Sequence, residues 1–292
     1  MTQHLQRDKL SIPELKRKSI QYRKTILSII KNANAGHTGG DLSCVDILNV
    51  LYNYVLNVSP ATFTDPNRDR YIQSKGHSVE TLYTVLADKG FYSRKELDTL
   101  NLFKSHFIGH PTRKVNGIEH NTGALGHGLS VSVGIALAGK IDGLTYRVYT
   151  LLGDGELEEG SNWEASMSAS HYGLDNLVVI VDRNTLQITG RTEEVTQLAP
   201  LGDKFRAFGY AVTEVDGNDV EELVQIFDQI PFKKGKPSLI LARTTKGKGI
   251  SFIEDQAVWH HHVPNDKEFV AAMSELQLAE EAWQVQYGTR QI

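Results

Sequence analysis

Two polar clusters, each directly after a predicted strand, carry the clearest chemical signal in this sequence. Gly153-Asp154-Gly155 follows a β-like run at 147–152, and Asn184 follows an apolar run at 177–181. About 30 residues separate the clusters, the length of one strand–helix–strand unit, so adjacent parallel strands would bring Asp154 and Asn184 to the same sheet edge. A carboxylate, an amide carbonyl and a backbone carbonyl form an oxygen donor set that suits Mg²⁺ or Ca²⁺ beside phosphate oxygens.

Gly155 supports a phosphate site at this edge. It lacks a Cβ where phosphate must come close, and the helix after it would present its first N–H groups to the anion. The alternative is two ordinary strand-to-helix turns, in which Gly, Asp and Asn are common for conformational reasons. Together and at this spacing, the two clusters favour the metal and phosphate site.

The elements that must position these residues alternate between strand and helix. A capping box at Ser11 and Glu14 predicts a first helix that runs to residue 32 and ends at the Gly-rich segment 35–40. We predict strands at 70–73, 147–152, 177–181, 210–215 and 238–242, helices at 43–56, 79–89, 159–171, 202–208 and 220–228, and a helical segment from residue 264. This alternation predicts an α/β fold, a parallel sheet with helices on both faces, in which ligands lie beyond the carboxyl ends of the strands.

Composition excludes several classes of protein. The chain has 292 residues, of which 40% are apolar, and its interleaved charges sum to −4, which argues against nucleic-acid binding. A single Cys excludes an internal disulfide framework. The longest apolar run is far below the ~20 residues of a membrane helix, and the polar N-terminus lacks a signal-peptide core. We therefore expect a soluble, cytoplasmic protein without a membrane or nucleic-acid partner.

Further motifs follow one another along the whole chain. They are GHTGG at 36–40, SKGH at 74–77, GHP at 109–111, TGALGHG at 122–128, GDGELEEG at 153–160, DRNTLQ at 182–187, and KGKG at 246–249 with Trp259-His260. In this order they resemble the transketolase family of thiamine diphosphate enzymes, from residue 12 to residue 265. The resemblance implies a diphosphate-binding (PP-type) α/β domain at 1–265 and a C-terminal helical tail at 266–292.

The resemblance implies a role in cofactor binding for several matching residues. Mg²⁺ (or Ca²⁺) would be bound by Asp154, Asn184 and the carbonyl of Leu186. Thiamine diphosphate would be held on its diphosphate side by His77, Gly155, His260 and the metal ligand Asn184, and on its aminopyrimidine side by the backbone of Gly123, Ala124 and Leu125.

The resemblance also implies that His37, His110 and His260 meet sugar hydroxyls. The residue type suits this role, because a neutral imidazole can donate or accept a hydrogen bond and can move protons near neutral pH. Any single loop His could instead be a turn or surface residue. Four histidines inside matching Gly-rich motifs favour the functional interpretation.

Two other patterns compete with this interpretation. His260-His261-His262 suggests a transition-metal site, but consecutive side chains cannot all point at one ion, and no Cys or carboxylate motif accompanies them. The family usually has Gly where His261 stands. Gly126-x-Gly128 opens like a dinucleotide fingerprint, but Val131 occupies the third glycine position.

The family's catalytic acid has no counterpart in this sequence. In transketolase-like enzymes, a Glu that activates the pyrimidine of the cofactor lies on a second domain supplied by another subunit. The resemblance thus implies a two-component enzyme in which this chain joins a C-terminal subunit carrying the pyrimidine-binding domain, as an α2β2 heterotetramer. The alternative is a truncated piece of a longer enzyme, and the start Met and charged helical end favour a natural subunit.

Glu159 and Glu164 follow the GDG motif on a predicted helix. By resemblance this helix meets its counterparts at the subunit interface, and Glu159 is the better candidate for a carboxylate network towards the partner's catalytic Glu. The alternative is an acidic helix start that complements the helix dipole.

The implied reaction is transfer of a two-carbon ketol unit from a ketose to an aldose. Pentose phosphates, apulose 4-phosphate and a sulfonated sugar such as sulfofructose all stay open as substrates. Alternatives are the α-chain of a 2-oxo acid dehydrogenase E1, a deoxyxylulose phosphate synthase relative, or a non-catalytic cofactor-binding module. Gly109-His110-Pro111 and Trp259-His260 favour transketolase, and the intact metal donor set argues against a non-catalytic module.

Overall fold

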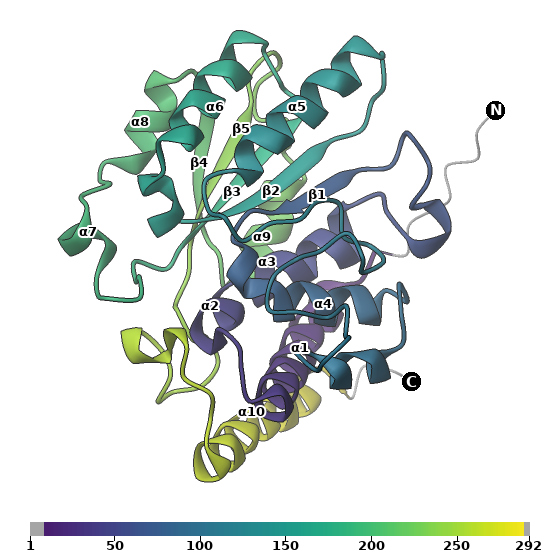
Figure 1. Cartoon of the computed structure of the whole chain (residues 1–292), viewed down its shortest axis with the longest axis vertical. Helices are drawn as coiled ribbons and strands as arrows, with labels where there is room; N and C mark the ends of the chain where they lie inside the picture. The colour runs from purple at the N-terminus through teal and green to yellow at the C-terminus, as the bar shows by residue number, and fades with distance from the viewer. Residues whose placement is uncertain (1–8, 289–292) are drawn as a thin grey trace.

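Five parallel strands form the centre of the chain in this computed structural model, which describes residues 9–288 (Figure 1). The strands are β1 (Arg70–Gln73), β2 (Val148–Gly153), β3 (Leu177–Arg183), β4 (Ala211–Asp216) and β5 (Ser238–Arg243). They lie in the order β1-β2-β3-β5-β4, and every neighbouring pair is parallel. The predicted parallel α/β sheet is confirmed, and the carboxyl ends of all five strands share one edge.

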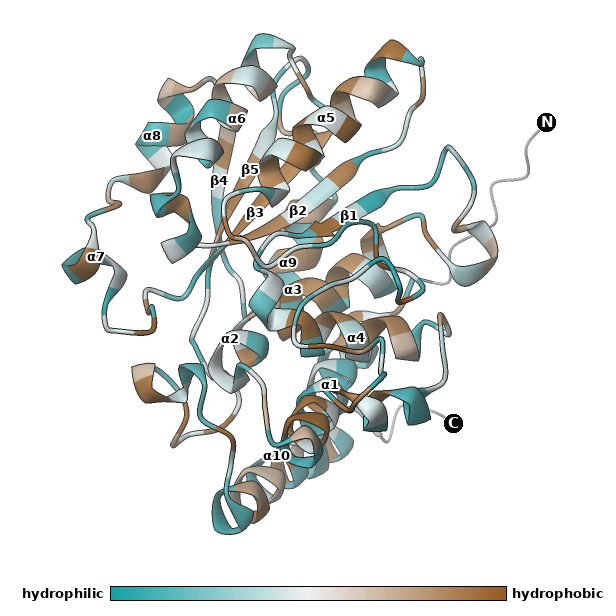
Figure 2. Cartoon of the chain, in the orientation of Figure 1, coloured by the Kyte–Doolittle hydropathy of each residue, from teal (hydrophilic) through white to brown (hydrophobic). Residues whose placement is uncertain are grey.

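The central strand β3 shows why a short apolar run forms a strand here. Its residues 177–181 are fully buried, as expected for a parallel strand that is covered on both faces. Successive side chains point to opposite faces, so Val178 and Ile180 belong to one hydrophobic core and Val179 and Val181 to another. Figure 2 shows the hydrophobic colour gathered along these middle strands.

Helices cover both faces of the sheet (Figure 1). One face is covered by α5 (Gly128–Ile141), α6 (Gly160–His171) and α8 (Leu201–Ala207). The other carries α1 (Ile12–Ala33), α2 (Thr38–Ser43), α3 (Val45–Val50), α4 (Val79–Asp88), α9 (Val220–Phe227) and α10 (Asp266–Tyr287). The short α7 (Thr192–Val195) follows β3. Within residues 9–288, no helix is long and apolar enough to cross a membrane.

Two helical regions differ from the prediction. Helix α5, which packs against β2 and α6, was not predicted. Its exposed side carries small and apolar residues, Gly134, Ala138 and Ile141, as its buried side does, so the sequence shows no single apolar stripe. The expected helix at 43–56 is α3 followed by a π-helical turn at Leu51–Val55. A separate short helix, α2, forms inside the Gly-rich segment that was expected only to end a helix.

The helix α10 lies against α1, at the opposite end of the sequence. Lys24 of α1 contacts Glu280 at 2.6 Å, and the indole N–H of Trp283 donates to the carbonyl of Pro13 at 2.8 Å. α1 begins at the predicted capping box, where the backbone N–H of Ser11 donates to Glu14 at 2.7 Å. The predicted helix after residue 264 is therefore present and packs on the first helix.

A buried ion pair joins the end of β1 to the centre of the sheet. Lys75 follows β1, and its ammonium lies 2.5 Å from the carboxylate of Asp182 on β3. The same ammonium donates to the carbonyl of Gly40 at 2.6 Å and to the hydroxyl of Ser43 at 3.0 Å, so all three of its protons have acceptors. Burial alone would raise the pKa of Asp182, but Lys75 lowers it, so the pair stays ionised. It holds α2 against the sheet edge.

Replacing Lys75 with Met should lower the free energy of unfolding by about 3–5 kcal/mol, because Asp182 would stay buried without a counter-charge. Arg206→Met is the control, since it removes an exposed pair with Asp203 and should cost less than about 1 kcal/mol. Urea denaturation followed by circular dichroism measures both. Equal stabilities of the two variants would contradict the role given to the buried pair.

Candidate functional site

A cavity of about 390 Å³ opens at the carboxyl edge of the sheet. Its walls come from the segments after β1, β2, β3 and β5 and from three further loops, so residues far apart in sequence meet here. The lining residues are His37, Lys75, His77, His110, Gly123, Leu125, Gly153, Asp154, Gly155, Glu156, Asn184, Leu186, Gln187, Ile188, Thr189, Lys246, His260 and His261. The expectation that the polar clusters gather beyond the strand ends is confirmed.

The predicted oxygen donors follow adjacent strands. Gly153 of β2 pairs with Asp182 of β3 in the sheet register, which places Asp154 and Asn184 at neighbouring strand ends. Both side chains are buried, and together with Leu186 they line the cavity. The prediction that Asp154 and Asn184 lie at the same edge of the sheet is therefore confirmed.

These oxygens already accept hydrogen bonds. The Asp154 carboxylate accepts from the backbone N–H of Thr185 at 2.7 Å and from the Arg183 guanidinium at 3.2 Å. Burial and the nearby Asp182 raise the pKa of Asp154, and Arg183 opposes this shift. Thr192 also donates to Oδ2 of Asp154 at 3.3 Å, and the backbone N–H of Gly155 donates to Oδ1 at 2.9 Å. The free capacity for a cation is therefore one lone pair on Oδ1, together with the second lone pairs of the Asn184 side-chain oxygen and the Leu186 carbonyl. The residues fit a hard divalent ion.

Four imidazoles from separate loops face one another across the cavity. The ring centroid of His37 lies 5.3 Å from that of His77, 5.9 Å from that of His110 and 5.6 Å from that of His260. Burial lowers the pKa of all four, to about 3 for His37 and about 2 for His260. Each ring is therefore neutral at pH 7, with one nitrogen that donates and one that accepts. The Nδ1 atom of His37 is buried without a partner among residues 9–288.

Lys246 brings positive charge to the same wall. Its ammonium donates to the carbonyl of Leu186 at 3.1 Å and contacts Nδ1 of His260 at 2.8 Å. Burial, followed by the charge of Lys75, lowers the pKa of Lys246 to about 8, so most of it is protonated at pH 7. Because Lys75 is neutralised by Asp182, Lys246 supplies the positive charge that makes this wall attractive to an anion. In the sequence both lysines stand out only as parts of motifs; their places two and three residues after β1 and β5 are the signal that could have found them.

The three consecutive histidines do not act as one group. His260 and His261 join His37, and one ligand atom from each lies within 4.8 Å of the others, whereas His262 contacts Glu268 at 2.9 Å. The argument that all three cannot reach one ion is confirmed. The ammonium of Lys246 against His260 further disfavours a cation at this cluster.

The loop at 123–125 reaches the cavity in part. Gly123 has φ +129°, and a Cβ there would lie 2.6 Å from Cδ2 of His110, so only glycine lets His110 pack in this way. Gly123 and Leu125 line the cavity, but Ala124 is exposed and lies outside the lining.

The segment after Gly155 differs from the expectation. It forms a 3₁₀ helix, Gly155–Glu158, and α6 begins at Gly160, one residue from the predicted helix start at 159, so the first N–H groups after Gly155 belong to a 3₁₀ helix and not to the predicted α-helix. The side chain of Gln187 lies against Gly155, where an added Cβ would meet it at 2.9 Å.

The acidic residues of the GDGELEEG motif have different surroundings. Glu159 is the exposed N-cap of α6 and lies outside the cavity lining. Glu156 is buried instead and accepts from the backbone N–H groups of Gly126 and Gly153, each at 3.0 Å, and from the Ser74 hydroxyl. Sequence reasoning missed Glu156, whose hydrogen bonds connect the three cavity segments that carry Ser74, Gly126 and Gly153.

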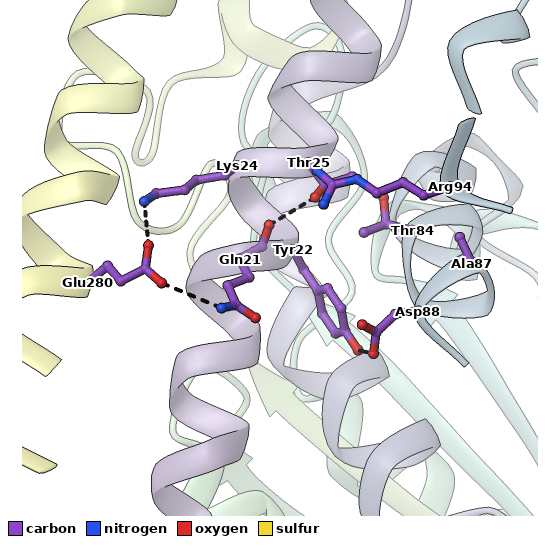
Figure 3. A pocket seen from close by; sticks show the side chains of 9 residues that line it. All are labelled: Gln21, Tyr22, Lys24, Thr25, Thr84, Ala87, Asp88, Arg94 and Glu280. Carbon is purple, nitrogen blue, oxygen red and sulfur yellow. Dashed lines mark hydrogen bonds and ion pairs between the residues drawn. The ribbon is translucent and has the colours of Figure 1, made fainter. Parts of the chain in front are cut away.

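A second cavity, of about 550 Å³, lies between α1, α4 and α10 (Figure 3). Its polar side chains pair with one another: Lys24 with Glu280 at 2.6 Å, and the Tyr22 hydroxyl with Asp88 at 2.7 Å. These contacts join three helices, and the cavity gathers no imidazole and no set of metal donors. The chemistry-bearing residues belong to the first cavity.

Comparison with known proteins agrees with the geometry of that cavity. Residues 16–286 match the family described as "Transketolase, thiamine diphosphate binding domain". The chain belongs to the transketolase family.

Similar proteins include chains of about the same length. A subunit of the apulose-4-phosphate transketolase of Phocaeicola vulgatus is 48% identical over 267 residues, which are 91% of this chain and 95% of that one. A subunit of the 6-deoxy-6-sulfo-D-fructose transketolase of Clostridium sp. is 42% identical over 256 residues, 87% of this chain and 93% of that one.

Among solved structures, the transketolase of Campylobacter jejuni superposes with a TM-score of 0.84 at 30% identity. The match covers 94% of this chain but 46% of that transketolase. The chain thus has the thiamine diphosphate-binding fold of transketolase and spans about half the length of that enzyme.

Gly123→Ala should destabilise this transketolase-family chain by about 1–3 kcal/mol, the usual cost of a strained backbone conformation, and should displace His110. Gly134→Ala is the matched control, because Gly134 is exposed in α5 with open space around it and alanine should add about 0.5–1 kcal/mol of stability there. Thermal unfolding and the imidazole NMR resonances of His110 check both effects. An unshifted His110 resonance in Gly123→Ala would show that the contact does not constrain this ring.

Proposed function

We propose that this chain is the thiamine diphosphate- and Mg²⁺-binding subunit of a two-component transketolase. The reaction would transfer a two-carbon ketol unit from a ketose to an aldose. The cavity at the carboxyl edge of β2 and β3 carries the proposal, because it joins a buried oxygen donor set to four neutral imidazoles and a lysine. The names of the similar subunits support the same reaction.

In this proposal the metal-side residues hold the charged end of the cofactor. Asp154, Asn184 and the carbonyl of Leu186 would bind Mg²⁺ (or Ca²⁺), which prefers such oxygen ligands. The diphosphate would lie against His77, Gly155 and His260. When bound, thiamine diphosphate would supply a carbon nucleophile for the ketose carbonyl.

The aminopyrimidine would lie along the backbone at 123–125, with Gly123 and Leu125 at the cavity wall. Ala124 is exposed in this chain, so only its backbone is assigned there.

His37, His110 and His260 would orient the sugar. Each neutral ring offers one donor and one acceptor to hydroxyl groups. The unpartnered Nδ1 of His37 is a buried polar atom beside the cavity that such a hydroxyl would satisfy. Because burial holds the pKa of His37 and His260 far below 7, these rings would act as hydrogen-bonding groups for the sugar hydroxyls rather than as bases.

The partner in this proposal is a C-terminal subunit with the pyrimidine-binding domain, in a cytoplasmic α2β2 assembly. The similar proteins of the same length are themselves named as subunits of transketolases, which supports a second chain. Glu159, exposed at the start of α6, would face this partner and take part in a carboxylate network with its catalytic Glu.

For the donor sugar, apulose 4-phosphate is the first candidate, because identity to the apulose-4-phosphate subunit is 48%, against 42% for the sulfofructose subunit. A donor panel with both sugars and a pentose phosphate, assayed on the assembled enzyme, tests this choice. A larger kcat/KM for another donor would overturn it.

Asp154→Ala should abolish Mg²⁺-dependent binding of thiamine diphosphate to the assembled enzyme, since it removes the only charged protein ligand proposed for the metal. Asp203→Ala, an exposed change on α8, should bind normally. Isothermal titration calorimetry with and without Mg²⁺ gives both affinities. Unchanged affinity in Asp154→Ala would refute the metal assignment.

The isolated chain should lack ketol-transfer activity and gain it when mixed with the pyrimidine-domain partner, because the activating Glu comes from that partner. Turnover by the chain alone would refute the split site.

Glu159→Ala should weaken assembly by about tenfold, roughly 1.4 kcal/mol, without changing the thermal stability of the isolated chain. Glu214→Ala, exposed on β4, should assemble normally. Normal assembly and turnover of Glu159→Ala would show that Glu159 serves only as the N-cap of α6.

A further inference from the structure

A pair of carboxyl groups is buried beneath the loop that carries His37. Asp41 belongs to α2 and Glu80 to α4, and neither side chain is exposed to solvent (0% for both). Neither residue lines the cavity, and the proposed transketolase chemistry does not use them. Two buried acids side by side need a specific physical explanation, because a buried charge is costly unless it is paired.

The hydrogen bonds of the pair are incomplete if both groups are ionised. One oxygen of Asp41, Oδ1, accepts from the backbone N–H of Thr81 at 2.8 Å and from its hydroxyl at 2.9 Å. The other oxygen of Asp41 and both oxygens of Glu80 find no donor among residues 9–288. Three buried carboxyl oxygens without a donor are a strong sign that a proton is present.

The two carboxyl groups are neighbours, because Oδ1 of Asp41 accepts from Thr81, the residue after Glu80, and each group shifts the pKa of the other. Burial raises the pKa of Asp41 to about 6, and burial together with the charge of Asp41 raises the pKa of Glu80 well above its usual value. The nearest cation, Lys75, has all three protons engaged by Gly40, Ser43 and Asp182. A protonated Glu80 that donates to Oδ2 of Asp41 gives a partner to two of these three oxygens and leaves the pair with one negative charge instead of two.

This pair lies directly under the His37 loop. A Cβ on Gly36 would be 3.2 Å from Oε1 of Glu80, so the Glu80 carboxyl packs against the residue before His37. The backbone N–H of Asp41 donates to the carbonyl of His37 at 3.0 Å, and His37 is the N-cap of α2. Lys75 anchors the same helix through the Gly40 carbonyl. Helix α2 is therefore anchored to the sheet by Lys75 and to α4 by the acid pair.

We propose that Asp41 and Glu80 share one proton, and that this shared proton makes Glu80 a positioning residue, which fixes α2 and thereby places the His37 imidazole in the cavity. The shared proton rests on the burial of the two carboxyl groups and on their lack of hydrogen-bond donors among residues 9–288. The consequence for the sugar rests on the proposed function.

Infrared spectroscopy of the full chain tests the proton directly. In D₂O at neutral pH, the wild type minus Glu80→Gln difference spectrum should show the C=O stretching band of a protonated carboxyl group. Glu281→Gln, an exposed change on α10, should give no such band. Absence of the band from the Glu80→Gln difference would overturn the shared proton, whether or not the chain is a transketolase.

Steady-state kinetics of the assembled enzyme test the positioning. Glu80→Ala should raise the KM for the donor ketose about tenfold with little change in kcat, because misplacement of a substrate-positioning group weakens productive binding. Glu80→Gln keeps a donor for Asp41 and should restore the KM to within about twofold of wild type. A wild-type KM in Glu80→Ala, or no rescue by Gln in a variant that unfolds like wild type, would overturn the positioning role.

Discussion

The ion pair between Lys75 and Asp182 is the interaction on which the arrangement of the cavity depends. It connects the segment after β1 to the end of β3 and, through Gly40 and Ser43, to α2. Removing two charges from water costs several kcal/mol per ion, and the complete set of acceptors around Lys75 offsets this cost. Three loops that approach the sheet from different parts of the sequence are thereby held in one relative position. His37, His77 and Asn184 lie on these loops, a few residues from the pair.

Two walls of the cavity favour ligands of opposite charge. Lys246 and the neutral imidazoles form a wall that favours an anion, and Asp154 with its neighbouring carbonyl oxygens forms a wall that favours a cation. Both walls meet at the same edge because parallel strands end there. A ligand with an anionic group bridged by a divalent ion complements both, and a diphosphate with Mg²⁺ is such a ligand. The fold therefore supports the proposed cofactor on electrostatic grounds as well as by family.

From the sequence we could predict the elements that show a periodic apolar pattern and the site residues whose motifs lie one strand–helix–strand unit apart. The buried strands and the meeting of Asp154 with Asn184 follow from alternation and from the length of one strand–helix–strand unit. Helix α5 left no such signal, because small and apolar residues lie on its exposed side as well as on its buried side. Glu156, Lys75 and Lys246 escaped notice as site residues, since burial and pairing of a charged side chain depend on contacts between distant segments. For Ala124 and Glu159, the motif places the residue near the site, but the local backbone turns it outside the cavity lining.

The position of Lys246 links two properties of the site that are usually considered separately. Its ammonium contacts both the Leu186 carbonyl, on the loop that carries Asn184, and the imidazole of His260. Residues in one hydrogen-bond network have interaction energies of about 0.5–3 kcal/mol, so changes on either side of Lys246 are not independent. Under the proposed roles of Asn184 and His260, exchanging the loop at 184–189 between relatives would therefore alter sugar selectivity along with metal retention. In an evolving lineage the two traits would change together, with Lys246 as the residue that couples them.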